Sequence, residues 1–290
     1  MPFLLAEILN FQGSTHLIGV GSLSQIFFEK LDSLFAEKKI PEAEIYMKES
    51  LAEAESSGDH PAVIAICSEL GGYYRAVSNY EAGIPLYEKA LRLINTLGQN
   101  GTSAHGTTLI NYATMCTMKG DLKKALALYE QAVEIFSAPS FAGDFRLATL
   151  YNNMSFVCQD MKEFEKAENY LKKALSILEG LSESEIEIAV TCTNLGNLYA
   201  AEGRKDEAKE LLLKACRIFR TESGDRDVHY AAAVSALGDL YYTEGELVKA
   251  AEQFEKALQL IARDYGTDND NYRIVEKNLH LCRAGETNHD

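Results

Sequence analysis

The chain has 290 residues, of which 47% are apolar and 24% charged, and its formal net charge is −15. An acidic surface repels phosphate, and nucleic-acid affinity comes largely from Lys and Arg that displace counterions. We therefore expect neither nucleic acid nor an anionic membrane as a partner. No segment has the roughly 20 continuous apolar residues of a membrane helix, and the N-terminus lacks the basic region and cleavage site of a signal peptide, so we expect a cytoplasmic protein.

The first 22 residues are apolar, contain glycine and fit no repeat. The sequence leaves open whether this segment packs over the first helices or lies in a groove of its own chain or of a neighbouring chain. Residues 23–57 follow, with the apolar spacing of two amphipathic helices in a slightly shifted register. We expect a degenerate helix pair there.

Residues 60–265 repeat five times with a period close to 42 residues. The Ala of an "x-A-L"-like element recurs at steps of 42, 42, 41 and 42, and a bulky landmark residue 20 positions upstream keeps the same steps. Two independent positions that share one period indicate a repeat architecture. The alanines are Ala90, Ala132, Ala174, Ala215 and Ala257, and the landmark residues are Leu70, Tyr112, Met154, Leu195 and Leu237.

Each repeat has the pattern of two amphipathic helices with a turn between them. In the fourth repeat, Leu195, Leu198 and Tyr199 form one apolar face at i, i+3, i+4 spacing, and Gly203 marks the turn. A small residue follows each landmark and a bulky residue occupies one place in the second helix, which predicts closely packed backbones. The small residues are Gly71, Ala113, Ser155, Gly196 and Gly238, and the bulky ones are Tyr87, Tyr129, Leu171, Leu212 and Phe254.

The segments LGNLYAAEGRKDEAKELLLKA (195–215) and LGDLYYTEGELVKAAEQFEKA (237–257) resemble the tetratricopeptide repeat. The 42-residue period is similar to that of kinesin light chains rather than to the usual length of about 34 residues. The resemblance implies an all-α, right-handed α–α superhelix with about six helix pairs. Residues 268–284 would add a C-terminal capping helix with Asp268 as its N-cap. We expect residues 23–284 to stack as one domain.

In this family the first helix of each pair lines the concave side, so the residue before a buried landmark should face the groove. Asn111, Asn153 and Asn194 occupy that position in consecutive repeats, whereas Glu69 and Ala236 interrupt the series. A carboxamide offers a donor beside an acceptor and matches a peptide unit. The resemblance implies that this position contacts a peptide backbone. Further groove candidates are Asn152, Gln159, Asn197, Asp239, Arg75 and Tyr242.

A structural explanation of the same asparagines remains open, since they could bond to a neighbouring helix and stabilise the stack. The six cysteines fall at repeat positions held elsewhere by apolar residues or are widely separated, which favours packing over redox or metal chemistry. The histidines share no repeat position and have no metal-binding spacing, and no phosphate-binding loop occurs. We expect no catalytic residue, metal or cofactor, and hence no enzyme.

The sequence thus favours an adaptor or scaffold that holds a protein or an extended peptide in its groove. One alternative is a regulatory receptor for a signalling peptide, although such receptors usually carry an output module and no helix-turn-helix or basic stretch is visible. Another is a self-assembling module, in which residues 1–22 or the convex face form a homodimer.

Overall fold

The computed structural model describes residues 22–224, 227 and 229–286. Over these residues the chain forms thirteen α-helices and two short helical turns, without a strand, which confirms the expected all-α superhelical repeat fold. The expectations for residues 1–21 lie outside the described residues. Contacts divide the chain into two compact units, the first ending at Asp144 and the second beginning at Phe145.

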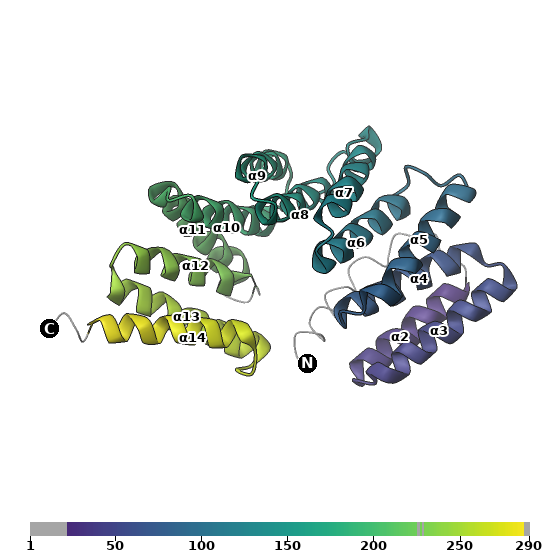
Figure 1. The fold of residues 1–290 in the computed structure, drawn as a ribbon, viewed down its shortest axis with the longest axis horizontal. Helices are drawn as coiled ribbons and strands as arrows, with labels where there is room; N and C mark the ends of the chain where they lie inside the picture. Colours follow the sequence, from purple (N-terminus) through teal and green to yellow (C-terminus); the bar gives the residue numbers. More distant parts are fainter. Residues whose placement is uncertain (1–21, 225–226, 228, 287–290) are drawn as a thin grey trace. The chain divides into compact units, whose positions relative to one another are not determined.

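The first unit contains three antiparallel helix pairs (Figure 1). Each first helix also contacts the first helix of the next pair, as α4 does with α6, so the pairs stack in chain order. The helices are α2 (Ser22–Ala36), α3 (Ile40–Ser57), α4 (His60–Ala76), α5 (Tyr80–Thr96), α6 (Ser103–Lys119) and α7 (Leu122–Phe136).

The second unit contains three further pairs and a last single helix, with first-helix contacts from α10 to α12 and from α12 to α14. A 3-10 turn at Pro139–Phe141 precedes the unit boundary, and a π-helical turn at Phe219–Ser223 extends α11. The helices are α8 (Arg146–Asp160), α9 (Phe164–Leu178), α10 (Glu185–Ala201), α11 (Lys205–Ile218), α12 (Tyr230–Thr243), α13 (Leu247–Tyr265) and α14 (Asp270–Glu286).

The turn inside each pair is fixed by one residue in the left-handed region of backbone space. Glycine takes this conformation at no steric cost, and it ends a helix by satisfying the last carbonyl groups. The predicted role of the turn glycines is confirmed, and other residues take the same conformation in the remaining pairs. The φ values are 88° at Gly120, 79° at Gly203 and Gly245, 58° at Lys38, 57° at Ser78 and 63° at Lys162.

The small residue after each landmark lets the second helix approach closely, as predicted. A Cβ atom added to Gly71 would lie 2.7 Å from Cζ of Tyr87, and one added to Gly238 would lie 2.7 Å from Cε1 of Phe254. Such contacts are too short for a real side chain, so in these two repeats the bulky ring of the second helix requires a glycine opposite it. The sequence pattern of small and bulky residues therefore sets the spacing of the two helices.

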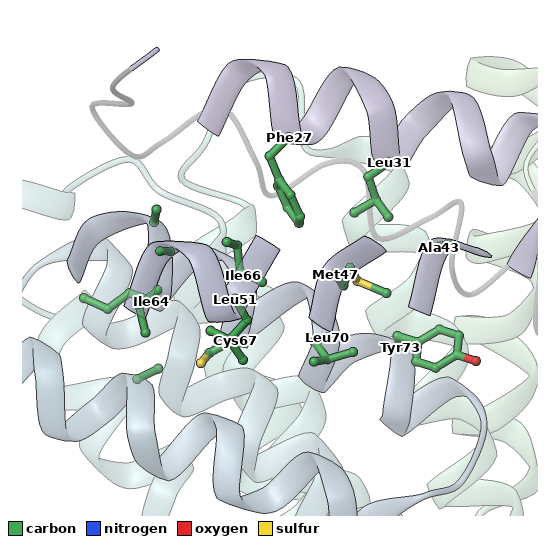
Figure 2. Close-up of a cluster of buried hydrophobic side chains, with 14 of the residues drawn as sticks. Phe27, Leu31, Ala43, Met47, Leu51, Ile64, Ile66, Cys67, Leu70 and Tyr73 are labelled. Carbon is green, nitrogen blue, oxygen red and sulfur yellow. The ribbon is translucent and has the colours of Figure 1, made fainter. Parts of the chain in front are cut away.

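The interior of each unit is apolar. Figure 2 shows part of the cluster in the first unit, where Phe27 and Leu31 of α2 point toward Met47 of α3 and toward the side chains of α4. In the second unit α14 completes the core with Val275 and Leu279, which are 4% and 6% exposed. Burial of these apolar side chains is the main stabilising contribution.

The last helix begins two residues later than expected, and its N-cap is Asn269 rather than Asp268. The Asn269 Oδ1 atom accepts a 2.9 Å hydrogen bond from the backbone N–H of Tyr272, while Asn269 Nδ2 donates to the carbonyl of Gly266. Asn269 is buried, whereas the Asp268 carboxylate is exposed and pairs with the Arg273 guanidinium. An amide caps better at this buried place because it can donate as well as accept.

The cysteines pack as apolar side chains, which agrees with their repeat positions. Five are buried and Cys216 is half-buried. Burial raises the pKa of Cys67 to about 12 and that of Cys116, Cys192 and Cys216 to about 11. These thiols therefore stay protonated at neutral pH. None of the helices that the structure places has the length and apolar character needed to cross a bilayer.

Candidate functional site

The three predicted asparagines lie where each first helix passes from its buried to its exposed side. Asn111 is in α6 of the first unit, whereas Asn153 in α8 and Asn194 in α10 belong to the second unit. All three are half-buried, and the landmark residues that follow them are only 2–3% exposed. The expected burial of the landmark is thus confirmed, and the asparagines stand beside it.

Asn194 makes a hydrogen bond to the preceding repeat. Its Nδ2 atom donates to Asn152 Oδ1 at 2.9 Å, across 42 residues of sequence. Asn152 Nδ2 in turn donates to the Thr191 hydroxyl at 2.9 Å and to the Ala148 carbonyl at 3.2 Å. This amide network joins α8 to α10, which is the structural use of asparagine that the sequence left open.

Asn152 was predicted to face the groove, but its side chain is buried against α10. It is only 9% exposed, and both ends of its carboxamide are occupied by other groups of the chain. The reason lies in helix geometry, since one residue turns the side chain by about 100°. That step turns Asn152 toward α10 and leaves Asn153 at the exposed edge.

Asn153 has a carboxamide that makes no hydrogen bond to any residue that the structure places, although it is half-buried. The Oδ1 atom of Asn194 likewise accepts no hydrogen bond there, because only its Nδ2 atom is used. A half-buried carboxamide without a partner retains its full capacity to donate and accept. These two groups, on neighbouring repeats of the second unit, are available to form hydrogen bonds with a ligand.

An exposed aromatic side chain that the sequence analysis missed lies one turn after Asn153. Phe156 is 46% exposed in α8, and the residue in the same repeat position of α10 is the exposed Asn197. The available signal was the three-residue step from Asn153, which keeps two side chains on the same helix face. An exposed aromatic ring beside unpaired amides is typical of a binding surface.

A fourth asparagine continues the series in α14 and was also missed. Asn278 precedes the buried Leu279, as Asn194 precedes Leu195, so counting one more period would have found it. Its Nδ2 atom donates to Oδ1 of the exposed Asp239 at 3.0 Å. Although the side chain reaches the surface, surrounding atoms partly remove its carboxyl from water and raise the pKa of Asp239 above its ordinary value, whereas the bond from Asn278 opposes that rise.

We call the positions one residue before and two residues after each landmark, within the second unit, the first-helix face. Side chains three residues apart share one side of a helix, so these positions form one row across the four helices. On α8, α10, α12 and α14 they are Asn153, Phe156, Asn194, Asn197, Ala236, Asp239, Asn278 and Leu281.

The remaining predicted groove residues share one repeat position near the ends of first helices. Gln159 in α8 is half-buried, and its Nε2 atom has no hydrogen-bond partner within the described part of the chain. Tyr242 in α12 is 42% exposed. Arg75 belongs to the first unit, where its charge acts on the buried hydroxyl of Tyr87 and opposes the burial that raises the pKa of that tyrosine.

Glu69 occupies the asparagine position in α4 of the first unit. Burial raises the pKa of its carboxyl to about 8, and the nearby charge of Asp32 adds to the rise. The first regular repeat thus has, in place of asparagine, a glutamate whose carboxyl has a strongly raised pKa.

The sequence model of the tetratricopeptide repeat matches residues 65–138 and 146–221, together just over half of the chain. No curated protein matches the sequence. The solved structure of BtubC (BKLC) from P. vanneervenii is similar with a TM-score of 0.67 and 22% identity, over 80% of this chain and 94% of that chain. A putative kinesin light chain from Podosopora anserina gives 0.58 and 19%, over 70% and 98%.

The structure of NprR in complex with its cognate peptide NprX is similar with a TM-score of 0.57 and 15% identity, over 96% of this chain and 86% of that chain. The fold of the chain is therefore shared with repeat proteins whose own sequences differ widely from it. From the repeat pattern, the stacked helix pairs and the family match, the chain belongs to the tetratricopeptide repeat family, with repeats of the kinesin light chain-like kind.

Proposed function

We propose that the protein is a cytoplasmic, non-catalytic scaffold that holds an extended peptide segment of another protein against the first-helix face. The observation that carries this proposal is the Asn153 carboxamide, which is half-buried and makes no hydrogen bond within the described residues, beside the exposed ring of Phe156. The family is built for protein interaction. NprR, which shares the fold, was solved with a peptide, and this supports a peptide as the ligand.

The chemistry of the proposed contact follows from the Asn153 carboxamide and the free Oδ1 atom of Asn194. An extended peptide presents its N–H and C=O groups alternately, and a carboxamide pairs with one of each. Asn153 supplies both a donor and an acceptor, and Asn194 supplies its oxygen while its N–H bond to Asn152 holds it in place. Phe156 then contacts an apolar side chain of the peptide.

The test begins with peptides selected from a phage-displayed dodecapeptide library on the immobilised full chain. A selected peptide is synthesised, and its affinity is measured by isothermal titration calorimetry. Asn153→Ala removes two hydrogen bonds worth about 1 kcal/mol each, so the Kd should rise tenfold or more. The matched control is Asn169→Ala, which removes an exposed carboxamide from the second helix α9 of the same repeat. Equal binding by wild type and Asn153→Ala would refute the proposed contact.

The contribution of Asn111 requires a separate measurement because it belongs to the first unit. If the peptide also contacts α6, Asn111→Ala should weaken binding by a similar factor. If the peptide is confined to the second unit, the affinity should be unchanged. Either result defines the length of the bound segment.

The resemblance to NprR also supports a second candidate, a receptor that changes conformation when a signalling peptide binds. Small-angle X-ray scattering of the full chain with and without the selected peptide distinguishes the two, since a scaffold keeps its radius of gyration and a switching receptor changes it. Self-assembly is tested by light scattering over a range of protein concentrations, where a dimer gives twice the monomer mass of 32.1 kDa.

A further inference from the structure

The last helix does more than cover the final pair, because it continues the first-helix face. Val275, Leu279 and Cys282 of α14 turn inward and are at most 6% exposed. The packing of α14 against α12 and α13 (Figure 1) places Asn278 in the register of the preceding first helices. Leu281, two residues after Leu279, is 46% exposed and belongs to the same face. The face therefore extends over four helices.

Asp239 is the acidic group of this extended face, and its only described bond is to a neutral partner. The Asn278 amide donates to it at 3.0 Å, and Asp239 takes part in no ion pair among residues 22–224, 227 and 229–286. Two half-buried acids of the same unit, by contrast, are paired with cations. Glu168 lies 2.8 Å from Lys172, and Glu244 lies 2.7 Å from Lys209.

The surroundings of Asp239 leave its charge without compensation. Partial removal from water makes a carboxylate more costly to ionise unless a cation lies nearby, and the raised pKa of Asp239 has this cause. The eight positions of the first-helix face include no Lys or Arg, and Asp239 is the acidic residue among them. The face is therefore negative and complements a cation.

Apolar surface lies next to this carboxylate on both helices. Tyr242 follows Asp239 by one turn of α12, and Leu281 follows Asn278 by one turn of α14; they are 42% and 46% exposed. A Lys or Arg side chain combines a charged end with an apolar stem, which packs along such side chains. A tyrosine ring also attracts a cation placed over its face.

We infer that Asp239 is the charged anchor of the peptide site and selects partners with a Lys or Arg side chain in the bound segment. The basic side chain pairs with the Asp239 carboxylate, its stem contacts Tyr242 and Leu281, and the neighbouring backbone lies on the amides of Asn153 and Asn194. This inference rests on the proposed function and adds the chemistry of the partner to it.

The selection from the dodecapeptide library also tests this inference. Peptides enriched on the full wild-type chain should carry Lys or Arg at one position far more often than the starting library. For a selected peptide, Asp239→Asn should raise the Kd about tenfold or more, since a hydrogen bond to a charged group contributes about 1.5–3 kcal/mol. The matched control Asp206→Asn neutralises an exposed carboxylate in the second helix α11 and should leave the Kd unchanged.

A peptide with glutamine in place of its basic residue tests the same contact without altering the protein. It should bind wild type about as weakly as the parent peptide binds Asp239→Asn, and salt should weaken only the parent. The inference would be overturned if the enriched peptides had no basic position, or if Asp239→Asn bound the peptide as tightly as wild type. The Asn153→Ala result would still decide the proposed function. If no peptide is enriched at all, both proposals fail.

Discussion

Replacement of Asn152 by alanine should destabilise the chain far more than replacement of its neighbour Asn153. Asn152 takes part in three hydrogen bonds, to the Ala148 carbonyl at 3.2 Å, to the Thr191 hydroxyl at 2.9 Å and from Asn194 Nδ2 at 2.9 Å. Each is worth about 1 kcal/mol net, and the buried groups left behind lose their partner. We expect a loss of about 2–3 kcal/mol in the free energy of unfolding.

The two neighbouring asparagines provide graded controls for this prediction. Asn194→Ala removes a single bond of the network and should cost about 1 kcal/mol. Asn153→Ala removes a carboxamide with no hydrogen bond among the described residues, so its effect should stay within about 0.5 kcal/mol. Urea denaturation followed by far-UV circular dichroism measures all three.

A double-mutant cycle isolates the bond between Asn152 and Asn194. The double variant should be about 1 kcal/mol more stable than the sum of the two single losses predicts, because the second substitution removes a bond that is already absent. Three outcomes would contradict the reasoning. They are an Asn152→Ala loss below about 0.5 kcal/mol, an Asn153→Ala loss as large as that of Asn152→Ala, and a coupling energy of zero.

Three further predictions concern the turns, the helix contacts and pH. Lys162→Gly should raise the urea midpoint, with a gain of about 0.5–1 kcal/mol, because the residue has φ of 63° where glycine is unstrained; an unchanged midpoint would contradict this. Gly238→Val should cost at least about 1–3 kcal/mol by collision with Phe254, and adding Phe254→Leu should restore part of the loss. Hydrogen bonds from Lys172 and other donors hold the pKa of Glu168 at about 2, so the stability that this group contributes above about pH 5 should be lost as the pH falls toward 2. Glu168→Gln should flatten this dependence of the unfolding free energy on pH, and an unaltered dependence would contradict the prediction.

The sequence was informative about everything that the 42-residue period controls. The period predicted the helix pairs, the buried landmarks and the glycine that faces a bulky ring, because these features depend on register within one repeat. The rotation of one repeat relative to the next was harder to predict from the sequence. Asn152 and Asn153 are chemically identical neighbours, and only the rotation of α8 against α10 decides which one turns inward.

Two other features needed the structure for related reasons. Phe156 is a large apolar residue of the kind usually buried in a core. Its exposure follows from its position on the helix rather than from its chemistry. The boundary after Asp144 lies between α7 and α8, and the repeat period does not distinguish this connection from the others. Asn278 is different, since one more step of the period would have revealed it.

The raised pKa of Glu69 bears on the series of asparagines, because Glu69 holds the same repeat position in the first regular repeat. Because its pKa is raised to about 8, the Glu69 carboxyl is mostly protonated at neutral pH and then presents a hydroxyl donor beside a carbonyl acceptor, the same pair of functions that an asparagine offers. In hydrogen-bonding terms α4 then matches α6, and the departure in sequence is not a departure in chemistry. The match ends in alkaline solution, where the ionised group can only accept.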